Sequence, residues 1–322
     1  MHHKFTSLLS LLAAFCFLTL GLPAFAESGT VTVAYPANMQ EKGYTESVVL
    51  DKMPERVVSI ATTPVLALYR LGVSMVGIPA SSVVTWPEDL TAAAEQLVVG
   101  HGSNFDIETV VAMEPDLVIM GYTSQETYGA VCEGAGIPVY YVDAGHTVSY
   151  ESIKQQTEAL IEAFGPESTA GAEVMASFSD LEARLESVKT EFTGKTVMVL
   201  QSSPPDHYIQ TAGGTLGSMA EMLGFTNVYE NAETSMVLVD YEQAIGYDPD
   251  LVLAVGASAT GEEHRTLMET DFKNNPDYWN SIPAIARGDI IYLPVSYVAS
   301  AGINVIDNIN ALIDTIGAHY AK

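Results

Sequence analysis

Residues that could carry out catalysis are scattered along this chain rather than gathered into a motif. The histidines beyond the N-terminal segment are far apart, and no two have the spacing of paired metal ligands. The chain also contains no Gly-x-Ser-x-Gly motif, which holds the serine nucleophile of α/β-hydrolases. The sequence therefore predicts neither a nucleophilic triad nor a histidine metal site. The histidines concerned are His101, His146, His207, His264 and His319.

A glycine-rich segment, AGGTLGSM at Ala212–Met219, resembles a phosphate-binding loop only in its glycine content. It lacks the lysine of a Walker motif and the spacing of the Gly-x-Gly-x-x-Gly motif. Glycine permits the tight backbone turns that precede a helix. We therefore predict a loop that leads into a helix, and no nucleotide site.

The remaining polar and aromatic chemistry lies in six segments that follow predicted strands. Open α/β sheets bind ligands at the carboxyl ends of their strands. Tyrosine, histidine and hydroxyl side chains are frequent in these segments, and such a lining suits a bulky, flat or partly polar ligand. We expect a binding cleft formed by both halves of the chain. The segments are Ala61–Thr63, Gly121–Tyr128, Asp143–Tyr150, Gln201–Gly214, Gly256–Arg265 and Val295–Gly302.

Short β-branched apolar runs alternate with helical patterns along most of the chain, which predicts an α/β fold with mostly parallel sheets. Two such units, Val57–Ala163 and Lys195–Pro294, flank a long helical pattern at Glu167–Phe192. The predicted organisation is an N-terminal lobe at 27–165, a connecting helix at 166–193 and a C-terminal lobe at 194–322. We expect Thr62 or Thr63 to cap a helix that starts at Pro64.

One motif occurs in both units, as MEPDLVIMG at Met113–Gly121 and as YDPDLVLAVG at Tyr247–Gly256. Each copy predicts a helix end, a Pro-Asp turn, a buried strand and a glycine. The carboxylates of Asp116 and Asp250 are expected to accept hydrogen bonds from backbone N–H groups there. The repeat therefore indicates two structurally equivalent modules.

The N-terminal 26 residues have the pattern of a secretory signal peptide, because a 15-residue apolar run ends in Pro23 and a small-residue site. We predict cleavage after Ala26 and export to the periplasm. A lipid anchor at Cys16 is not expected, because Phe15 precedes it. Cys132 would then be the single mature cysteine, and packing alone would hold the fold together.

The chain is strongly acidic, with a formal net charge of −27. Phosphate backbones and anionic lipid headgroups are repelled by such a chain. Nucleic acid and anionic membranes are therefore excluded as ligands. We expect a monomer that binds a small molecule.

Several segments in order resemble the substrate-binding proteins of ABC importers, in the class for iron–siderophore, haem and vitamin B12 complexes. They are PERVVSIATTPVLALYRLGVSMVGIP, VVGHGSNFDIETVVAMEPDLVIMG, GIPVYYVD and YEQAIGYDPDLVLAVG. The resemblance covers Pro54 to the C-terminus. It implies two Rossmann-like lobes joined by one helix, a ligand between the lobes, no catalysis and no cofactor.

The resemblance also implies that one glutamate on each lobe docks onto arginines of an inner-membrane permease dimer. By motif position these are Glu108 and Glu242, each seven residues before the proline of the repeat. Carboxylates form charge-assisted hydrogen bonds with arginine.

The identity of the ligand stays open among three kinds of metal complex: a ferric siderophore, haem and a corrinoid of the vitamin B12 type. An iron complex is favoured, and a ferric siderophore is favoured most. Arg265 is the one lysine or arginine in the six segments, which favours a neutral or hydroxamate-like complex over an anionic catecholate. Gly102 and Met236 stand where the vitamin B12 binder has aromatic residues. Tyrosine and histidine can ligate haem, so haem also stays open. The expected ligand-binding residues are Thr62, Thr63, Trp86, Tyr122, His146, Tyr150, His207, Tyr208, Met236, Ser258, His264, Arg265 and Tyr297.

Two readings from other classes stay open. An exported two-lobe enzyme, such as a hydrolase or metal chelatase, would need an acid–base pair with perturbed pKa values in the cleft. An adhesion or scaffold protein would have no cleft between the lobes.

Overall fold

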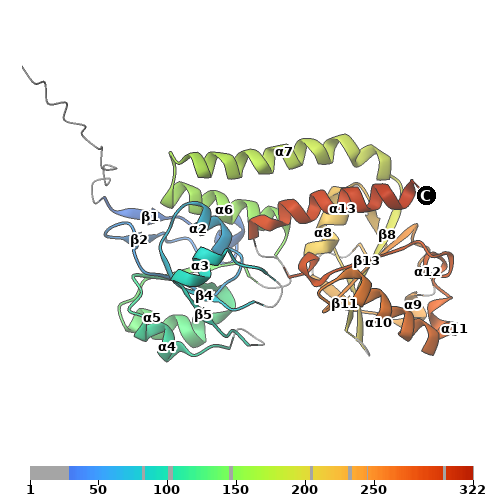
Figure 1. Ribbon diagram of the computed structural model, residues 1–322, viewed down its shortest axis with the longest axis horizontal. Coiled ribbons are helices and arrows are strands. Elements are labelled where there is room, and N and C mark those ends of the chain that lie inside the picture. The colour runs from blue at the N-terminus through green and yellow to red at the C-terminus, as the bar shows by residue number, and fades with distance from the viewer. Residues whose placement is uncertain are drawn as a thin grey trace, which may run out of the picture.

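The computed structural model describes residues 29–81, 84–100, 104–144, 148–203, 206–230, 234–244, 246–299 and 302–321. The predicted signal peptide, Cys16, Gly102 and His146 lie outside these residues. Within them, the chain builds two large β-sheets, one before and one after a long helix, and a small two-stranded sheet at the start (Figure 1).

The first sheet is entirely parallel, as the alternation of strands and helices predicts. Its strands lie in the order β5-β4-β3-β6-β7; four of them are almost entirely buried, whereas the edge strand β5 is mostly exposed. The strands are β3 (Val57–Ser59), β4 (Met75–Pro79), β5 (Glu95–Leu97), β6 (Leu117–Gly121) and β7 (Val139–Val142).

Short helices connect the strands of the first sheet. They are α2 (Val65–Arg70), α3 (Glu88–Ala93), α4 (Ile107–Ala112) and α5 (Ala130–Gly134). A 3-10 turn η2 (Tyr122–Ser124) and a π-helical segment η3 (Gln125–Gly129) lead from β6 into α5. The predicted threonine cap of α2 is wrong, because its N-cap is Pro64 and no side chain caps the helix.

The first described residues form a small unit beside this sheet. Strands β1 (Val31–Val33) and β2 (Val48–Leu50) pair antiparallel, and helix α1 (Ala37–Gln40) lies between them in sequence. The side chain of Asn38 donates to Ser152 Oγ at 2.6 Å. This contact ties α1 to the start of helix α6 (Tyr150–Phe164).

The second sheet is mixed, in the order β11-β9-β8-β12-β13 with β10 beside β8. Strands β8, β10, β12 and β13 run parallel, whereas β9 is antiparallel to both β8 and β11. The strands are β8 (Thr196–Ser203), β9 (Asp206–Gln210), β10 (Thr226–Asn227), β11 (Met236–Leu238), β12 (Leu251–Gly256) and β13 (Ile290–Leu293).

Two predictions for the second half are wrong. The segment expected as one loop at Gln201–Gly214 contains the end of β8 and all of β9. The loop expected at Gly256–Arg265 ends early, because helix α10 (Gly261–Asn274) begins inside it. The other helices of this half are α8 (Thr215–Met222), α9 (Tyr241–Ala244), α11 (Pro276–Trp279), α12 (Pro283–Arg287) and α13 (Val305–Tyr320), with 3-10 turns η4 (Val295–Tyr297) and η5 (Gly302–Asn304).

Helix α7 (Thr169–Phe192) spans both halves of the molecule along one side, with α6 and α13 beneath it in Figure 1. Its N-cap is Ser168, whose Oγ accepts a hydrogen bond from Gly171 N at 2.9 Å. This helix corresponds to the predicted connection at Glu167–Phe192.

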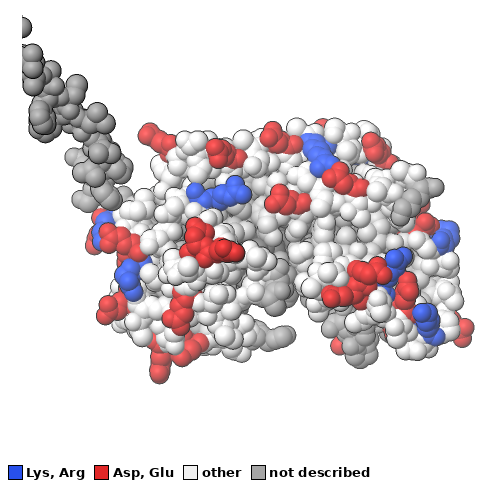
Figure 2. Space-filling view, in the orientation of Figure 1, with Lys and Arg blue, Asp and Glu red and all other residues white. Residues whose placement is uncertain are grey.

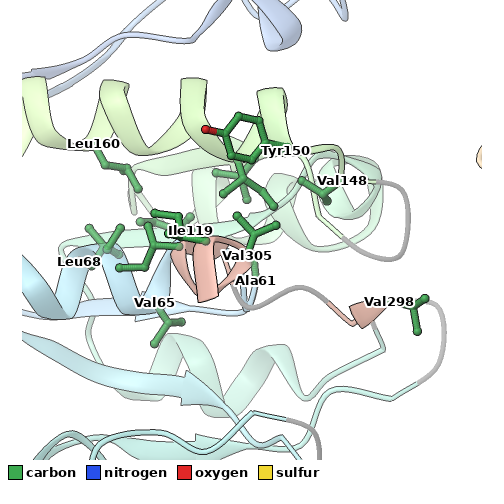
Figure 3. Packing of buried hydrophobic residues seen from close by; sticks show 14 of the residues in the cluster. Ala61, Val65, Leu68, Ile119, Val148, Tyr150, Leu160, Val298 and Val305 are labelled. Carbon is green, nitrogen blue, oxygen red and sulfur yellow. The ribbon is translucent and has the colours of Figure 1, made fainter. Parts of the chain in front are cut away.

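One hydrophobic cluster runs through both halves. Figure 3 shows Val305, from the first turn of α13, packed beside Ala61, Ile119 and Tyr150 of the first half. Gly302 is equally close: a Cβ there would lie 1.8 Å from the carbonyl oxygen of Thr63, and its φ is +73°. The C-terminal segment is therefore part of the core of the first half.

The repeated Pro-Asp motif has the same structural role twice. Asp116 accepts hydrogen bonds from the backbone N–H groups of Glu55 and Arg56 at 2.7 and 2.9 Å. Asp250 accepts one from the backbone N–H of Thr196 at 2.7 Å. Each carboxylate thereby ties the start of one strand to the start of its neighbour, as the sequence predicts.

Candidate functional site

The carboxyl ends of β6 and β7 carry a cluster of polar and aromatic side chains. Tyr122 follows β6, and Lys42 Nζ lies 5.3 Å from the centre of its ring. The same Nζ is 4.0 Å from Asp143 Oδ2, beyond the end of β7. The Tyr44 hydroxyl donates to Gln125 Oε1 at 2.5 Å. We call these five residues the Lys42 cluster.

The Lys42 cluster depends on the position of helix α1. Ser152 donates to Asp143 Oδ2 at 3.1 Å and accepts from Asn38 in turn. This chain of contacts fixes the turn that carries Lys42 against the end of β7. An ammonium group over a tyrosine face is stabilised by the electron-rich ring, and it can also bind an acidic ligand group.

The hydroxyl of Tyr44 in this cluster has a raised pKa. Burial raises the pKa of Tyr44, and the neighbouring Tyr122 and Glu133 raise it further. A phenol with a raised pKa stays a hydrogen-bond donor at neutral pH.

The sequence did not reveal Lys42 and Tyr44 as site residues. They lie before Val57, where the predicted alternation of strands and helices begins. Arg265 is the one lysine or arginine in the six predicted segments, and the structure adds Lys42, from outside those segments, at the carboxyl end of the first sheet.

Three predicted aromatic residues of the site are buried and have structural partners. Trp86 is 5% exposed and donates its indole N–H to Pro79 O at 2.8 Å. Tyr150 is 4% exposed, and its hydroxyl donates to Glu182 Oε1 of α7 at 3.0 Å. Tyr297 is 6% exposed within the main core, and burial raises its pKa.

Thr62 and Thr63 lie at the junction between the halves. Thr62 is half-buried, whereas Thr63 is 4% exposed and its backbone packs against Gly302. The Oγ1 atom of Thr63 is buried with no hydrogen-bond partner among the described residues.

In the second half, three of the predicted residues are half-buried on or directly after strands. Tyr208 of β9 pairs in register with Leu238 of β11, and Met236 lies two residues before Leu238. Ser258 follows β12, and its carbonyl accepts a hydrogen bond from Val295 N at 2.9 Å. Tyr208 and Met236 therefore lie on neighbouring strands, while Ser258 is next to the segment that precedes Tyr297.

The structure places His207 and His264 in the interior, not in open loops. Asp271 Oδ2 lies 3.4 Å from His207 Nε2, and Ser202 Oγ lies 3.0 Å from its Nδ1. His264 is 1% exposed, and its Nε2 has no hydrogen-bond partner among the described residues. Burial lowers the pKa of both histidines, for His264 to about 4. Both therefore pack helix α10 against the sheet in their neutral forms.

Arg265 lies on the outer side of the same helix. Its guanidinium lies 3.2 Å from Glu269 Oε1 and 5.5 Å from the ring centre of Tyr292. It borders a groove of about 520 Å³ between α10, β13 and α13. Arg265 and the Lys42 cluster are therefore in different parts of the fold.

A cavity of about 450 Å³ lies between the two halves beside α7. Three carboxylates border it, and the Lys154 ammonium beside Glu182 holds the pKa of that carboxyl below its usual range. Figure 2 also shows the molecule hollowed between its halves on the side opposite α7. The lining of the cavity is Ser149, Tyr150, Glu151, Glu182, Ala212, Ser218, Glu221 and Met222.

Glu108 and Glu242 occupy matching positions at the starts of α4 and α9. The backbone N–H of Glu108 donates to Asp106 Oδ1 at 3.0 Å, and that of Glu242 donates to Asp240 Oδ1 at 2.9 Å. Both glutamates are exposed. Both helices lie on the side of the molecule away from α7 (Figure 1).

Two negative findings apply to the described residues alone. No three of their histidine, cysteine, aspartate and glutamate side chains are grouped as a metal site would require. None of their helices combines the length and the apolar character needed to cross a bilayer.

Known proteins resemble this chain in sequence and in fold. A cobalamin-binding protein of Halobacterium salinarum is 26% identical over 217 residues, which cover 66% of this chain and 57% of that protein. The catecholate-siderophore binding protein VctP of Vibrio cholerae has a TM-score of 0.64 at 22% identity, covering 90% of this chain and 99% of that chain. S. aureus IsdE, crystallised with heme, has a TM-score of 0.66 at 18% identity, covering 81% and 98%.

The family described as periplasmic binding protein matches residues 57–297, from the first strand of the parallel sheet to Tyr297. This range contains both sheets and the whole of helix α7. The two-lobed α/β architecture is also that of the solved structures above. The chain therefore belongs to the periplasmic binding protein family.

Proposed function

We propose that this protein is the substrate-binding component of an ABC importer and that it captures an iron complex, first of all a ferric siderophore, between its two halves. It is proposed to act as a monomer, without a cofactor or catalysis, and to deliver its ligand to an inner-membrane permease dimer. Family membership supports the transport role, and the siderophore-binding neighbour supports the ligand class.

The observation that carries the proposal is the Lys42 cluster. It lies at the carboxyl ends of two parallel strands, where open α/β sheets bind ligands. The ammonium of Lys42 offers a positive charge to an acidic chelate, and the rings of Tyr44 and Tyr122 offer aromatic surface. An anionic complex is therefore a better match than the neutral complex that the sequence alone favoured.

A corrinoid is the second candidate, and the sequence similarity to the cobalamin-binding protein of Halobacterium salinarum favours it. The chain spans 57% of that relative, so the likeness does not extend over the whole of that protein. Cobalamin is bulky and partly polar, which suits a lining of tyrosine and methionine such as Tyr122, Tyr208 and Met236. Haem is the third candidate, with the half-buried Tyr122 as its axial ligand, because His207 and His264 are buried.

Thermal unfolding with a panel of ligands tests these alternatives. The panel consists of a ferric catecholate siderophore, a ferric hydroxamate siderophore, haem and cyanocobalamin. A ligand at 100 times its Kd stabilises the native state by about 2.7 kcal/mol, which raises Tm by several degrees. We expect the ferric catecholate to give the largest shift. A larger shift with cyanocobalamin would replace the siderophore by the corrinoid, and no shift with any ligand would overturn the binding proposal.

Export and docking complete the proposal. The N-terminal segment supports secretion with cleavage after Ala26, which the mass of the protein purified from a periplasmic extract tests directly. Glu108 and Glu242 are proposed to meet permease arginines, and their matching caps and exposure support equivalent roles.

A further inference from the structure

Positive charge is missing from two long stretches of this chain. No lysine or arginine occurs between Arg70 and Lys154, nor between Lys195 and Arg265. Both stretches contain many acidic residues, and each contains one of the two matched glutamates. The two halves therefore present acidic surface without nearby cations from the same stretch of sequence.

The first of these stretches exposes the aliphatic side chains of Val98 and Val131, and the second exposes that of Leu238. Val98 and Leu238 lie at the ends of edge strands. Val98 directly follows β5, the edge strand of the first sheet, and is 80% exposed. Leu238 ends β11, the edge strand of the second sheet, and is 62% exposed. An exposed leucine or valine alone is ordinary on a protein surface. Two at matching strand ends, each close in sequence to an Asp-x-Glu start of a helix, form a repeated arrangement.

The first of these sites contains a groove. Its volume is about 200 Å³, and it lies between strand β5 and helix α4. Phe105 forms part of its apolar wall and is held in place by Tyr128, whose ring centre is 4.2 Å away. Glu95 and Asp106 contribute carboxylates to the groove, and Glu108 follows Asp106 on α4. The groove is thus apolar within an acidic surface.

We propose that Val98 and Leu238 are the apolar parts of a docking surface for a membrane protein. Each lies beside an acidic helix start, so that the surface has one contact site on each half of the molecule. The partner's exposed loops would carry an apolar side chain next to arginine or lysine, once for each half of this molecule. This inference rests on the proposed function, and it extends the contact from the glutamates to the strand ends.

The charged part and the apolar part of each contact have different physical roles. Exposed charges guide the approach of an oppositely charged partner, and salt screens them. Burial of an aliphatic side chain stabilises the contact that follows and is insensitive to moderate salt. The glutamates should therefore set the rate of association, and Val98 and Leu238 the lifetime of the complex.

Photo-crosslinking in cells tests this surface and identifies the protein that covers it. Benzoylphenylalanine is placed at Val98, at Leu238 and, as a control, at Val49, which is 60% exposed on β2. We expect the first two probes to crosslink to the same membrane protein, identified by mass spectrometry, and the Val49 probe not to. Crosslinks to a second copy of this chain, to soluble proteins or to nothing would overturn the proposal.

A second measurement separates docking from ligand capture. Val98→Ser and Leu238→Ser are each expected to raise the concentration for half-maximal uptake by about three- to tenfold, because each removes one buried aliphatic contact. Val49→Ser should leave uptake unchanged. All three variants should keep the ligand-induced Tm shift of the unchanged protein. If both test variants take up ligand as well as the unchanged protein does, this inference is overturned. If the unchanged protein itself shows no ligand-induced Tm shift, the proposed function is overturned instead.

Discussion

At the scale of single residues, Lys42 is the group that we propose selects an acidic ligand. Its side chain is 35% exposed, and its ammonium lies 4.0 Å from Asp143 Oδ2 and over the ring of Tyr122. Neither contact has the geometry of a tight ion pair. The ammonium is therefore available to an acidic ligand, while the two contacts hold it in position before the ligand arrives.

Replacement of this lysine gives the first prediction. Lys42→Met keeps most of the side-chain volume and removes the charge, so the affinity for an anionic ferric chelate should fall by about tenfold. Lys52→Met is the matched control, because Lys52 is 55% exposed and pairs with Glu55 outside the cluster. Isothermal titration of both variants measures the effect. Equal affinities for the two variants would remove Lys42 from the site.

His264 gives the second prediction, which concerns pH. Its pKa is lowered from 6.5 to about 4, so the unfolded chain binds more protons than the native state between these values. The stabilisation from its neutral form is fully present above pH 6.5 and is lost as the pH falls toward 4. Between pH 7.5 and pH 5 the free energy of unfolding should decrease by about 2 kcal/mol from this residue.

The groups around His264 define the control for this measurement. Burial also lowers the pKa of His207, which adds to the same trend and is opposed by Asp271 and Asp206. Tyr292 of β13 faces the His264 ring, with centres 6.3 Å apart. His264→Leu should therefore reduce the pH dependence seen in urea unfolding without abolishing it. An unchanged pH dependence in this variant would contradict the prediction.

At the scale of elements, helix α10 begins with a signal that is local in the sequence. Thr260 and Glu263 form a capping box, in which each side chain bonds the backbone N–H of the other. This Thr-x-x-Glu pattern is typical of a helix start, although the segment was expected to be a loop. The helix is mostly polar on its exposed face, and its buried residues include His264 and Met268.

The capping box gives the third prediction. Thr260→Ala removes the side-chain acceptor for Glu263 N, so the free energy of unfolding should fall by about 0.5–2 kcal/mol. Thr266→Ala on the same helix is the control, because its hydroxyl only bonds the carbonyl of Glu262 within the turn. Chemical denaturation of the two variants should differ by that amount. Equal stabilities would show that the cap contributes nothing here.

Much of the fold could be predicted from sequence because its strands are continuous apolar runs. Strands β6 and β12 are entirely or almost entirely buried, and both were predicted from the Pro-Asp repeat. Strand β9 was not, because its residues DHYIQ include three polar side chains. His207 and Gln210 are buried there only because Ser202, Asp271 and Gln201 bond them. Such partners come from elsewhere in the chain, and no local pattern reveals them.

The candidate site was predicted less well for the same reason. Tyr122 could be predicted because it directly follows a strand. Lys42 could not, because the contact of α1 with α6 is what brings it over the Tyr122 ring. Gly256 is a further example, because a Cβ there would lie 2.4 Å from His264 Cε1. The sequence shows only that a glycine ends the strand. In the structure, the His264 ring fills the space that a side chain at position 256 would need.

At the scale of the whole molecule, the shared core makes the two halves depend on each other. The main cluster contains strands of both sheets, and α13 packs into the first half through Val305. This leads to the fourth prediction, a single cooperative unfolding transition in calorimetry despite two sheets. Two resolved transitions would indicate halves that fold separately.

Docking gives the fifth prediction. The double variant Glu108→Ala and Glu242→Ala should lose ligand uptake and keep ligand affinity, because both side chains are exposed and lie outside the Lys42 cluster. Each single variant should show a weaker defect that becomes smaller at high salt, since screening already removes the attraction. Uptake assays in whole cells provide the measurement. Full uptake by the double variant would contradict the assignment.

Helix α7 has a consequence for the choice of partner. Its 24 residues form one unbroken helix about 36 Å long, and the common core fixes both halves beneath it. We therefore expect the span between the two acidic helix starts to be set by the fold and to change little on ligand binding. The fold thus sets the distance between the starts of α4 and α9. On the proposed docking through Glu108 and Glu242, a permease whose two binding sites are spaced differently would contact only one of the two helix starts.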